Sequence, residues 1–395
     1  MDFSRNQILR IKVLSSGIFS LILTMGIARF AYTPLFPLMH DQAGLGPSEA
    51  GLLAAINYSG YLCGAITAFY INDLILKDRL YRIGMIVAVL STFMMGASDH
   101  YMIWALSRFM AGLSSAAGLM LGSGLILNWL IRSDHRNELG IHFSGVGIGI
   151  AVCSLVIIVT SPWLKYTEQW YVLSVLGLAL LVPILSWLPP PNKSIITKSG
   201  TLMLDNPPDQ LFLKIFMAAY FCAGFGYVIT ATFIVAIVNS LPGLEGKGDY
   251  VFLVIGLAAA PSCIFWDLIV RRIGEINSLL IAAFIQTLAI LLPVIITNTF
   301  GVMTSAILFG GTCMGIVSIT LTMAGRYFPT NPAKMMGEMT IAYGLAQIIG
   351  PAFIGYVAAK TDSYSLGLIV AASIMFVGAL LFSMLKRIKK FPLTL

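Results

Sequence analysis

The sequence has few charged residues. Charged side chains make up 10% of the 395 residues, whereas hydrophobic side chains make up 58%. In a soluble globular domain about 25% of the residues are charged. This shortage of charge excludes an ordinary soluble enzyme and indicates a protein that is embedded in a membrane.

The chain also lacks the motifs of several other functional classes. Its five cysteines are far apart and lie in apolar runs, which fits neither a metal site nor a disulfide framework. The sequence contains no G-x-x-x-x-G-K-[ST] nucleotide-binding loop and no nucleophile beside a base. We therefore expect no metal, no cofactor, no enzymatic activity and no ATP-driven transport by this chain alone.

Long, unbroken apolar runs dominate the sequence. Crossing the hydrocarbon core as a helix takes about 20 apolar residues, and only helices or closed barrels satisfy the backbone there. Barrel strands would alternate apolar and polar residues over about ten positions, which these runs do not do. We predict an all-α membrane protein with twelve transmembrane helices, at residues 13–39, 49–72, 83–98, 101–130, 139–163, 168–188, 211–240, 250–270, 275–297, 300–326, 337–359 and 364–385.

One polar segment divides the chain into two halves. Residues 189–210 (PPPNKSIITKSGTLMLDNPPDQ) are rich in proline and form the longest predicted connection. We predict an N-terminal six-helix bundle at 1–188, a cytoplasmic linker at 189–210 and a C-terminal six-helix bundle at 211–395. A faint repeat supports two related halves, since DLILK at 73–77 and DLIVR at 267–271 follow the second and eighth helices.

The distribution of basic residues predicts the orientation in the membrane. With both termini in the cytoplasm, nineteen of the 24 Lys and Arg residues lie on the cytoplasmic side and three lie outside. This asymmetry follows the positive-inside rule. It also explains the net charge of +7 without a nucleic-acid partner. We expect the C-terminal segment LKRIKKF to lie near anionic lipid at the cytoplasmic surface.

Three segments carry a resemblance to a known family. LSRFMAGLSSAAG at 106–118 has Arg108 and Gly112 in the R-x-x-x-G spacing. GIARFAYTPLFPLM lies at 26–39 and YGLAQIIGPAFIG at 343–355. Together with the basic loops after the second and eighth helices, these segments resemble the major facilitator superfamily and its bacterial YbfB/YjiJ-like branch. The resemblance implies two pseudo-symmetric six-helix bundles, a bacterial inner-membrane location and a functional monomer.

Two features depart from the pattern of that superfamily. Leu74 and Tyr81 stand where its loop after helix two has glycines, although Asp78, Arg79 and Arg82 match. The proline-glycine signature of antiporters is missing from HFSGVGIGIAVCS in the fifth helix. The first departure weakens the expectation of the usual cytoplasmic gating network of ion pairs.

Two arginines lie inside predicted helices, while no acidic residue lies deep in one. Arg29 is close to the middle of the first helix, where insertion scales put the cost of an arginine at about 2.5–3.5 kcal/mol. A guanidinium grips carboxylate-like groups with two hydrogen bonds and keeps its charge. We predict that Arg29 lines a substrate cavity; the alternative is that it bonds helix carbonyls and fixes packing. Arg108 has the same alternatives, and a third is that it couples conformational change.

Uncharged polar residues complete the predicted site. Two pairs share a helix face through i, i+4 spacing: Asn57 with Tyr61, and Tyr343 with Gln347. Tyr227 lies seven residues after Tyr220, again on one face, and Tyr32 follows Arg29 by three residues. The family resemblance implies that their helices line a central cavity, whereas packing or an interfacial aromatic belt is the alternative for each tyrosine. The predicted substrate-binding residues are Arg29, Tyr32, Asn57, Tyr61, Arg108, Tyr227, Tyr343 and Gln347.

These observations lead to one functional hypothesis and two alternatives. Two embedded cations without an embedded acid favour a small organic anion as the substrate of a secondary transporter, which works by alternating access. Protons are the expected coupling ion, in a symporter. The first alternative is a multidrug or metabolite exporter with a mainly apolar cavity, and the second is a membrane sensor that does not transport.

Overall fold

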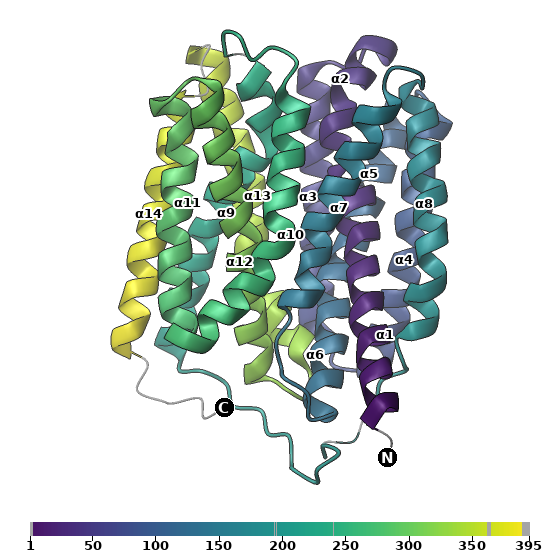
Figure 1. Cartoon of the computed structure of the whole chain (residues 1–395), viewed down its shortest axis with the longest axis vertical. Helices are drawn as coiled ribbons and strands as arrows, with labels where there is room; N and C mark the ends of the chain where they lie inside the picture. Colours follow the sequence, from purple (N-terminus) through teal and green to yellow (C-terminus); the bar gives the residue numbers. More distant parts are fainter. Residues whose placement is uncertain (1–2, 193, 195, 240, 362–364, 389–395) are drawn as a thin grey trace.

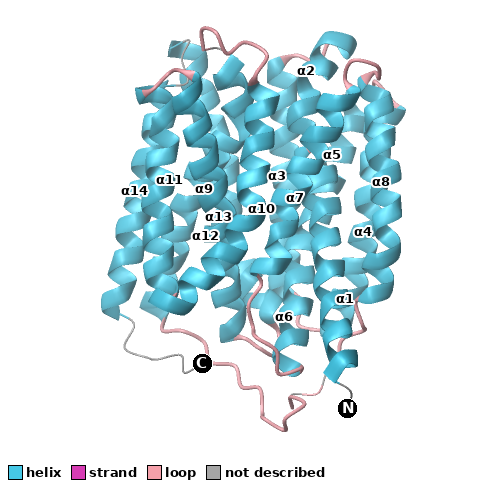
Figure 2. Ribbon diagram, viewed as in Figure 1, coloured by secondary structure: helices cyan, strands magenta, loops and turns pink. Residues whose placement is uncertain are grey.

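Long helices run roughly parallel to one another through the whole computed structural model (Figures 1 and 2). The structure describes residues 3–192, 194, 196–239, 241–361 and 365–388. Within these ranges, one isolated bridge between Ile196 and Leu202 is the whole of the β structure. The predicted all-α fold is confirmed. The basic tail residues Lys389 and Lys390 lie outside the described residues.

The N-terminal half crosses the bundle six times. Its first and fourth crossings are each continuous and contain a π-helical segment between two α-helices. In chain order, its elements are α1 (Phe3–Leu21), η1 (Ile22–Phe30), α2 (Tyr32–Ala43), α3 (Pro47–Tyr70), α4 (Leu74–Ala97), α5 (Tyr101–Ala116), η2 (Ala117–Gly122), α6 (Ser123–Arg132), α7 (Gly140–Thr160) and α8 (Tyr166–Trp187).

The C-terminal half consists of six uninterrupted helices. They are α9 (Gln210–Asn239), α10 (Gly248–Ile273), α11 (Glu275–Ile295), α12 (Thr299–Tyr327), α13 (Pro332–Thr361) and α14 (Ser365–Ile388). Each of the twelve predicted ranges therefore overlaps a helix or a continuous helical crossing. In the described part of the chain, eleven helical segments are long and apolar enough to cross a membrane. The side chains at the C-terminal end of α13 are not described, and this helix occupies the remaining predicted position.

The predicted start of the third helix, in the range 83–98, is wrong. The helix begins at Leu74, so the charged residues after it belong to the helix and not to a loop. Asp73 caps this start, because its carboxylate accepts a hydrogen bond from a backbone amide in the first turn. One turn further on, Asp78 and Arg82 form an i, i+4 ion pair of 2.9 Å. Capping and pairing let a charged segment continue an apolar helix.

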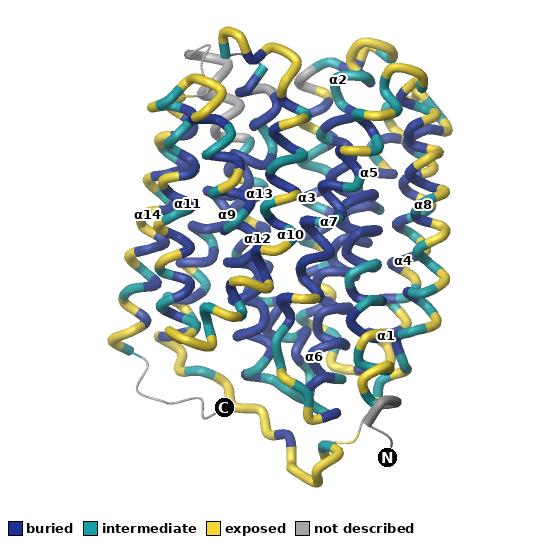
Figure 3. The backbone as a smooth tube through the Cα atoms, viewed as in Figure 1, coloured by how far each residue is buried: buried dark blue, intermediate teal, exposed yellow. Residues whose placement is uncertain are grey.

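The two halves lie side by side, with α1 to α8 on one side of Figure 1 and α9 to α14 on the other. Buried residues concentrate along the plane between them, and exposed residues lie mainly on outer helices (Figure 3). Helices α7 and α10 approach closely across this plane because both carry glycine there. A Cβ atom on Gly147 would lie 2.2 Å from the backbone nitrogen of Ala260, and one on Gly256 would lie 2.6 Å from that of Ala151.

The linker between the halves is bonded to both of them at one end of the bundle. The amide of Lys198 donates to the carbonyl of Arg132 at 2.9 Å, and the amide of Asn206 donates to the carbonyl of Tyr327 at 2.8 Å. The start of α1 and the end of α14 lie at this same end (Figure 1). We call it the linker end of the molecule.

Gly147→Ala is expected to lower the melting temperature of the purified protein, because the added methyl group collides with backbone that cannot rotate away. Gly311→Ala is the matched control, since a Cβ atom on Gly311 of α12 meets no atom within 4 Å. Alanine also has the higher helix propensity, so the control is expected to melt at the same temperature or higher. Equal melting temperatures for the two variants would contradict the close approach of α7 and α10.

Candidate functional site

The segment around Arg29 is a π-helix and not an ordinary α-helix. All nine residues of η1, Ile22–Phe30, are buried, and the amide of Ala31 donates to the carbonyl of Gly26 at 2.9 Å, five residues back. Such segments are rare and occur frequently at functional sites. Pro34 follows and has no N–H group to donate, and the amide of Leu35 donates to the carbonyl of Ala31, four residues back, at 3.2 Å, so the backbone leaves the π-helical pattern here. This part of the first crossing therefore has carbonyls that need donors from elsewhere.

Arg108, on α5, supplies those donors. Its Nη1 donates to the carbonyl of Ala28 at 2.9 Å, and its Nη2 donates to the carbonyl of Arg29 at 3.2 Å. The guanidinium carbon also lies 4.6 Å from the centre of the Tyr32 ring, a cation–π distance. Of the alternatives for Arg108, its contacts favour the one in which it bonds helix carbonyls and fixes packing.

Asn57 and Tyr32 belong to the same network around Arg108. Asn57, on α3, donates from Nδ2 to the carbonyl of Arg108 at 2.8 Å, and the Tyr32 hydroxyl donates to the carbonyl of Ala50 at 3.1 Å. Helices α3 and α5 cross tightly here, since a Cβ atom on Gly112 would lie 2.1 Å from the carbonyl oxygen of Asn57. These contacts position the first, second and fourth crossings against one another.

Arg29 has a different environment. Its side chain is 4% exposed, and its guanidinium carbon lies 4.5 Å, 4.9 Å and 5.4 Å from the ring centres of Tyr61, Tyr58 and Phe30. Its Nη2 donates a long hydrogen bond of 3.5 Å to Oε1 of Gln347, on α13 of the other half. The Nε atom is buried and has no hydrogen-bond partner among the described residues. Arg29 is therefore a buried cation with unused hydrogen-bonding capacity.

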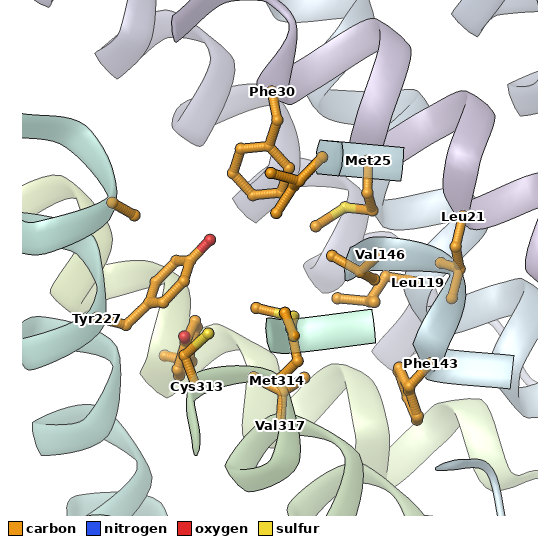
Figure 4. Close-up of a cluster of buried hydrophobic side chains, with 14 of the residues drawn as sticks. Leu21, Met25, Phe30, Leu119, Phe143, Val146, Tyr227, Cys313, Met314 and Val317 are labelled. Carbon is orange, nitrogen blue, oxygen red and sulfur yellow. The ribbon is translucent and has the colours of Figure 1, made fainter. Parts of the chain in front are cut away.

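Aromatic side chains of the C-terminal half face this cation. The ring centres of Tyr220 and Tyr343 are 4.5 Å apart, those of Tyr343 and Tyr227 are 5.8 Å apart, and Tyr227 stacks on Phe309 at 6.0 Å. Figure 4 shows Tyr227 with its hydroxyl directed toward Phe30, which lies across the plane between the halves. We call these four rings, Tyr220, Tyr343, Tyr227 and Phe309, the aromatic wall.

The structure thus divides the predicted site residues into two groups. Arg29, Tyr61 and Gln347 lie together, and Tyr227 and Tyr343 belong to the wall opposite them. Tyr32, Asn57 and Arg108 form the neighbouring packing network described above.

Sequence reasoning missed Tyr58, whose ring lies against Arg29 and whose hydroxyl is 3.3 Å from Oγ1 of Thr232 in the other half. Its i, i+3 spacing from Tyr61 is the signal that could have identified it, because residues three apart on a helix share a face.

The site is closed to solvent in this conformation. A cavity of about 550 Å³ lies at the linker end, and none of the predicted substrate-binding residues lines it. Its polar lining comes from the linker, from the loop before α4, from the end of α6, and from the first turn of α13 with the loop before it; it includes Arg132, Asp205 and Lys334. The enclosed position of Arg29, with residues of both halves around it, suits an occluded binding site between two moving halves.

Comparison with protein families decides what kind of protein has this geometry. Residues 21–383 match the model described as "Uncharacterised MFS-type transporter YbfB". The chain belongs to this family. The resemblance that the three sequence segments carry is confirmed, and the protein is a transporter of the major facilitator type, embedded in a membrane through many helices. The family description supports a transporter and not a sensor or an enzyme.

Two individual relatives of this MFS-type transporter are informative. It is 20% identical over 375 residues to the "Probable sulfoacetate transporter SauU" of Cupriavidus necator, an alignment that covers 87% of this chain and 86% of the relative. It is also 30% identical over 98 residues, 25% of each chain, to the "Uncharacterized MFS-type transporter YceJ" of Bacillus subtilis. The first relative matches nearly the whole length of both proteins.

Arg108→Ala is expected to lower the melting temperature of the detergent-solubilised transporter, whereas Arg29→Gln is expected to leave it unchanged or raise it. The first change leaves the carbonyls of Ala28 and Arg29 without donors, and each buried unsatisfied group costs about 1–3 kcal/mol. The second removes a buried charge that has no acidic partner among the described residues. If Arg29→Gln destabilises the protein as much as Arg108→Ala does, Arg29 is a packing residue.

Proposed function

We propose that this protein is a secondary active transporter that moves a small organic anion across the membrane by alternating access. The observation that carries the proposal is the environment of Arg29, a buried guanidinium between the two halves with an unpartnered Nε and one long hydrogen bond. A carboxylate or sulfonate supplies the acceptors that this group lacks. A cationic substrate would meet repulsion at the same place.

The substrate class also draws support from the relative of similar length, which is named as a probable sulfoacetate transporter. Sulfoacetate is a small organic anion, so an anion-binding centre suits both proteins. In the described residues, the carboxylates in ion pairs lie at the linker end and not beside Arg29. We infer that a small anionic molecule is the partner that enters the site.

Alternating access requires a gate on each side of the site, and the linker end has the bonds expected of a closed gate. Asp267, on α10, accepts a hydrogen bond of 2.7 Å from the amide of Gly140 at the start of α7. Beside it, Arg271 pairs with Glu138, with its Nε 2.7 Å from a carboxylate oxygen. These bonds join the two halves directly.

Further polar contacts strengthen the same closure. Nη2 of Arg326 donates to the carbonyl of Asn137 at 2.7 Å, and Lys77 donates to the side chain of Asn331 at 2.7 Å. We propose that residues 1–188 and 211–395 are the two moving units and that 189–210 connects them. In this scheme the structure represents a state that is closed toward the linker end.

The location and the coupling ion complete the proposal. The excess of basic residues at the linker end supports a cytoplasmic position for that end and for both termini, by the positive-inside rule. We propose that the protein functions as a monomer in the bacterial inner membrane, in contact with membrane lipid, and that protons are the coupling ion. Uptake driven by an imposed pH gradient in liposomes, compared with uptake driven by a membrane potential alone, tests the coupling.

Arg29→Gln is expected to reduce anion uptake into proteoliposomes by about 10- to 100-fold, because a charge-assisted hydrogen bond contributes about 1.5–3 kcal/mol. The measurement is uptake of a panel of labelled small organic anions that includes monocarboxylates, dicarboxylates and sulfoacetate. Arg29→Lys keeps the charge but loses the two-pronged geometry, so intermediate uptake is expected. Arg272→Gln, at an exposed position on α10, is the control for protein quality. Unchanged anion uptake by Arg29→Gln would refute the proposed site.

Glu138→Arg is expected to loosen the closed gate, because it places a like charge beside Arg271. The partly exposed pair is worth about 0.2–1 kcal/mol, so hydrogen exchange of the amides at the start of α7 should accelerate by about 1.4- to 5-fold. Combining Glu138→Arg with Arg271→Glu restores opposite charges and should restore slow exchange. Failure of the double variant to recover would show that this pair does not close the gate.

A further inference from the structure

We infer that the substrate carries one negative charge and a flat, apolar body, and that the site discriminates against dianions, a class that includes sulfoacetate. This inference rests on the proposed function, since it concerns the same site around Arg29. Three observations support it. The terminal nitrogens of Arg108 are bonded to the backbone, aromatic rings cover Arg29, and the aromatic wall faces Arg29.

One of the two embedded arginines is already bonded to the backbone. The sequence offers two embedded arginines, but both terminal nitrogens of Arg108 are bonded to the carbonyls of Ala28 and Arg29, and its carbon lies against the ring of Tyr32. Arg108 keeps its charge, yet it cannot turn toward a ligand without abandoning two buried carbonyls. The Nε atoms of both arginines lack a partner among the described residues, but the terminal nitrogens of Arg108 make two hydrogen bonds of 2.9 and 3.2 Å, whereas Nη2 of Arg29 makes a single long one of 3.5 Å. One free guanidinium binds one anionic group.

A second negative charge on the ligand would lack a free cationic donor near Arg29. The described groups around Arg29 and along the facing wall are aromatic rings, phenolic hydroxyls, the hydroxyl of Thr232 and the amide of Gln347. None of these is a cation, and the neighbouring Arg108 has both terminal nitrogens bonded to backbone carbonyls. A second anionic group would therefore be buried without cationic donors of its own, and the loss of its hydrogen bonds to water would not be fully offset.

Aromatic rings limit the directions from which a ligand can reach Arg29. The guanidinium carbon lies over the rings of Tyr61, Tyr58 and Phe30, all within 5.4 Å. Aromatic faces attract the cation but leave its N–H groups without strong acceptors. The anionic head of a ligand is thus expected to bind at the edge of the guanidinium, where two hydrogen bonds can form side by side.

The aromatic wall favours a flat, apolar body for the ligand. The charge comes from the N-terminal half, whereas the aromatic wall comes from the C-terminal half, and Figure 4 shows Tyr227 of that wall facing Phe30. Four successive rings offer flat apolar surface, which packs well against another flat apolar group. A ligand with its charge on Arg29 and its body on the wall would touch both halves at once.

Two pairs of probes test this inference with the full-length purified transporter. The first pair is p-toluate and terephthalate, which share a ring and differ in a methyl group against a second carboxylate. The second pair is butyrate and succinate, which are aliphatic and differ in the same way. Dissociation constants are measured by calorimetry at a pH where all carboxylates are ionised, for the wild type, for Arg29→Gln and for the control Arg272→Gln.

The expected result is that p-toluate binds at least about tenfold more tightly than terephthalate and more tightly than butyrate, and that Arg29→Gln abolishes the binding of both monoanions. Equal or tighter binding of the dianions, still dependent on Arg29, would overturn the inference and leave the proposed function standing. Absence of p-toluate binding would overturn it as well. Anion binding that is the same in Arg29→Gln as in the wild type would instead refute the proposed function.

The aromatic wall has its own matched variants. Tyr227→Phe keeps the ring and removes the hydroxyl, so the preference for p-toluate over butyrate should persist. Tyr227→Leu removes the ring, and because an aromatic pair contributes about 0.5–1.5 kcal/mol, the preference should fall by about 2- to 13-fold. An unchanged preference in Tyr227→Leu, with butyrate binding intact as the measure of folding, would show that the wall does not contact the ligand.

Discussion

The structure depends on how two guanidinium groups are kept inside an apolar helix bundle without an acidic partner beside them. Arg108 obtains its acceptors from the backbone, since the π-helical turn of η1 and the missing N–H of Pro34 leave carbonyls that it can bond. Arg29 receives only aromatic faces and one distant amide. The terminal nitrogens of the same residue type are thus bonded to the backbone at one position and weakly bonded at the other, and the difference lies in the acceptors around them.

The two halves contribute unlike surfaces to the space between them. The N-terminal half brings the cation and the rings that cover it, and the C-terminal half brings the aromatic wall and Gln347. Neither half surrounds Arg29 alone, so in the proposed alternating access the environment of Arg29 changes when the halves rotate apart. Alternating access links ligand binding to a conformational change when the ligand binds more tightly in one arrangement of the two halves than in the other.

Much of this arrangement could be predicted from the sequence, and the failures have physical causes. Apolar runs located all twelve crossings, and the cost of an embedded charge singled out Arg29. The start of α4 was misplaced because capping by Asp73 and an i, i+4 ion pair let a charged segment remain helical. The contacts of Arg108 depend on the π-helical register of η1 and on how α5 packs against it, which hydropathy and spacing do not reveal.

The π-helical turn also limits how this protein can change in evolution. Successive residues on an α-helix are rotated by about 100° about its axis. Losing or gaining one residue within η1 would therefore turn Arg29 away from Tyr61 and carry the carbonyls of Ala28 and Arg29 away from Arg108, even if every side chain were kept. Along this stretch the number of residues determines the environment of Arg29 as much as their identity does.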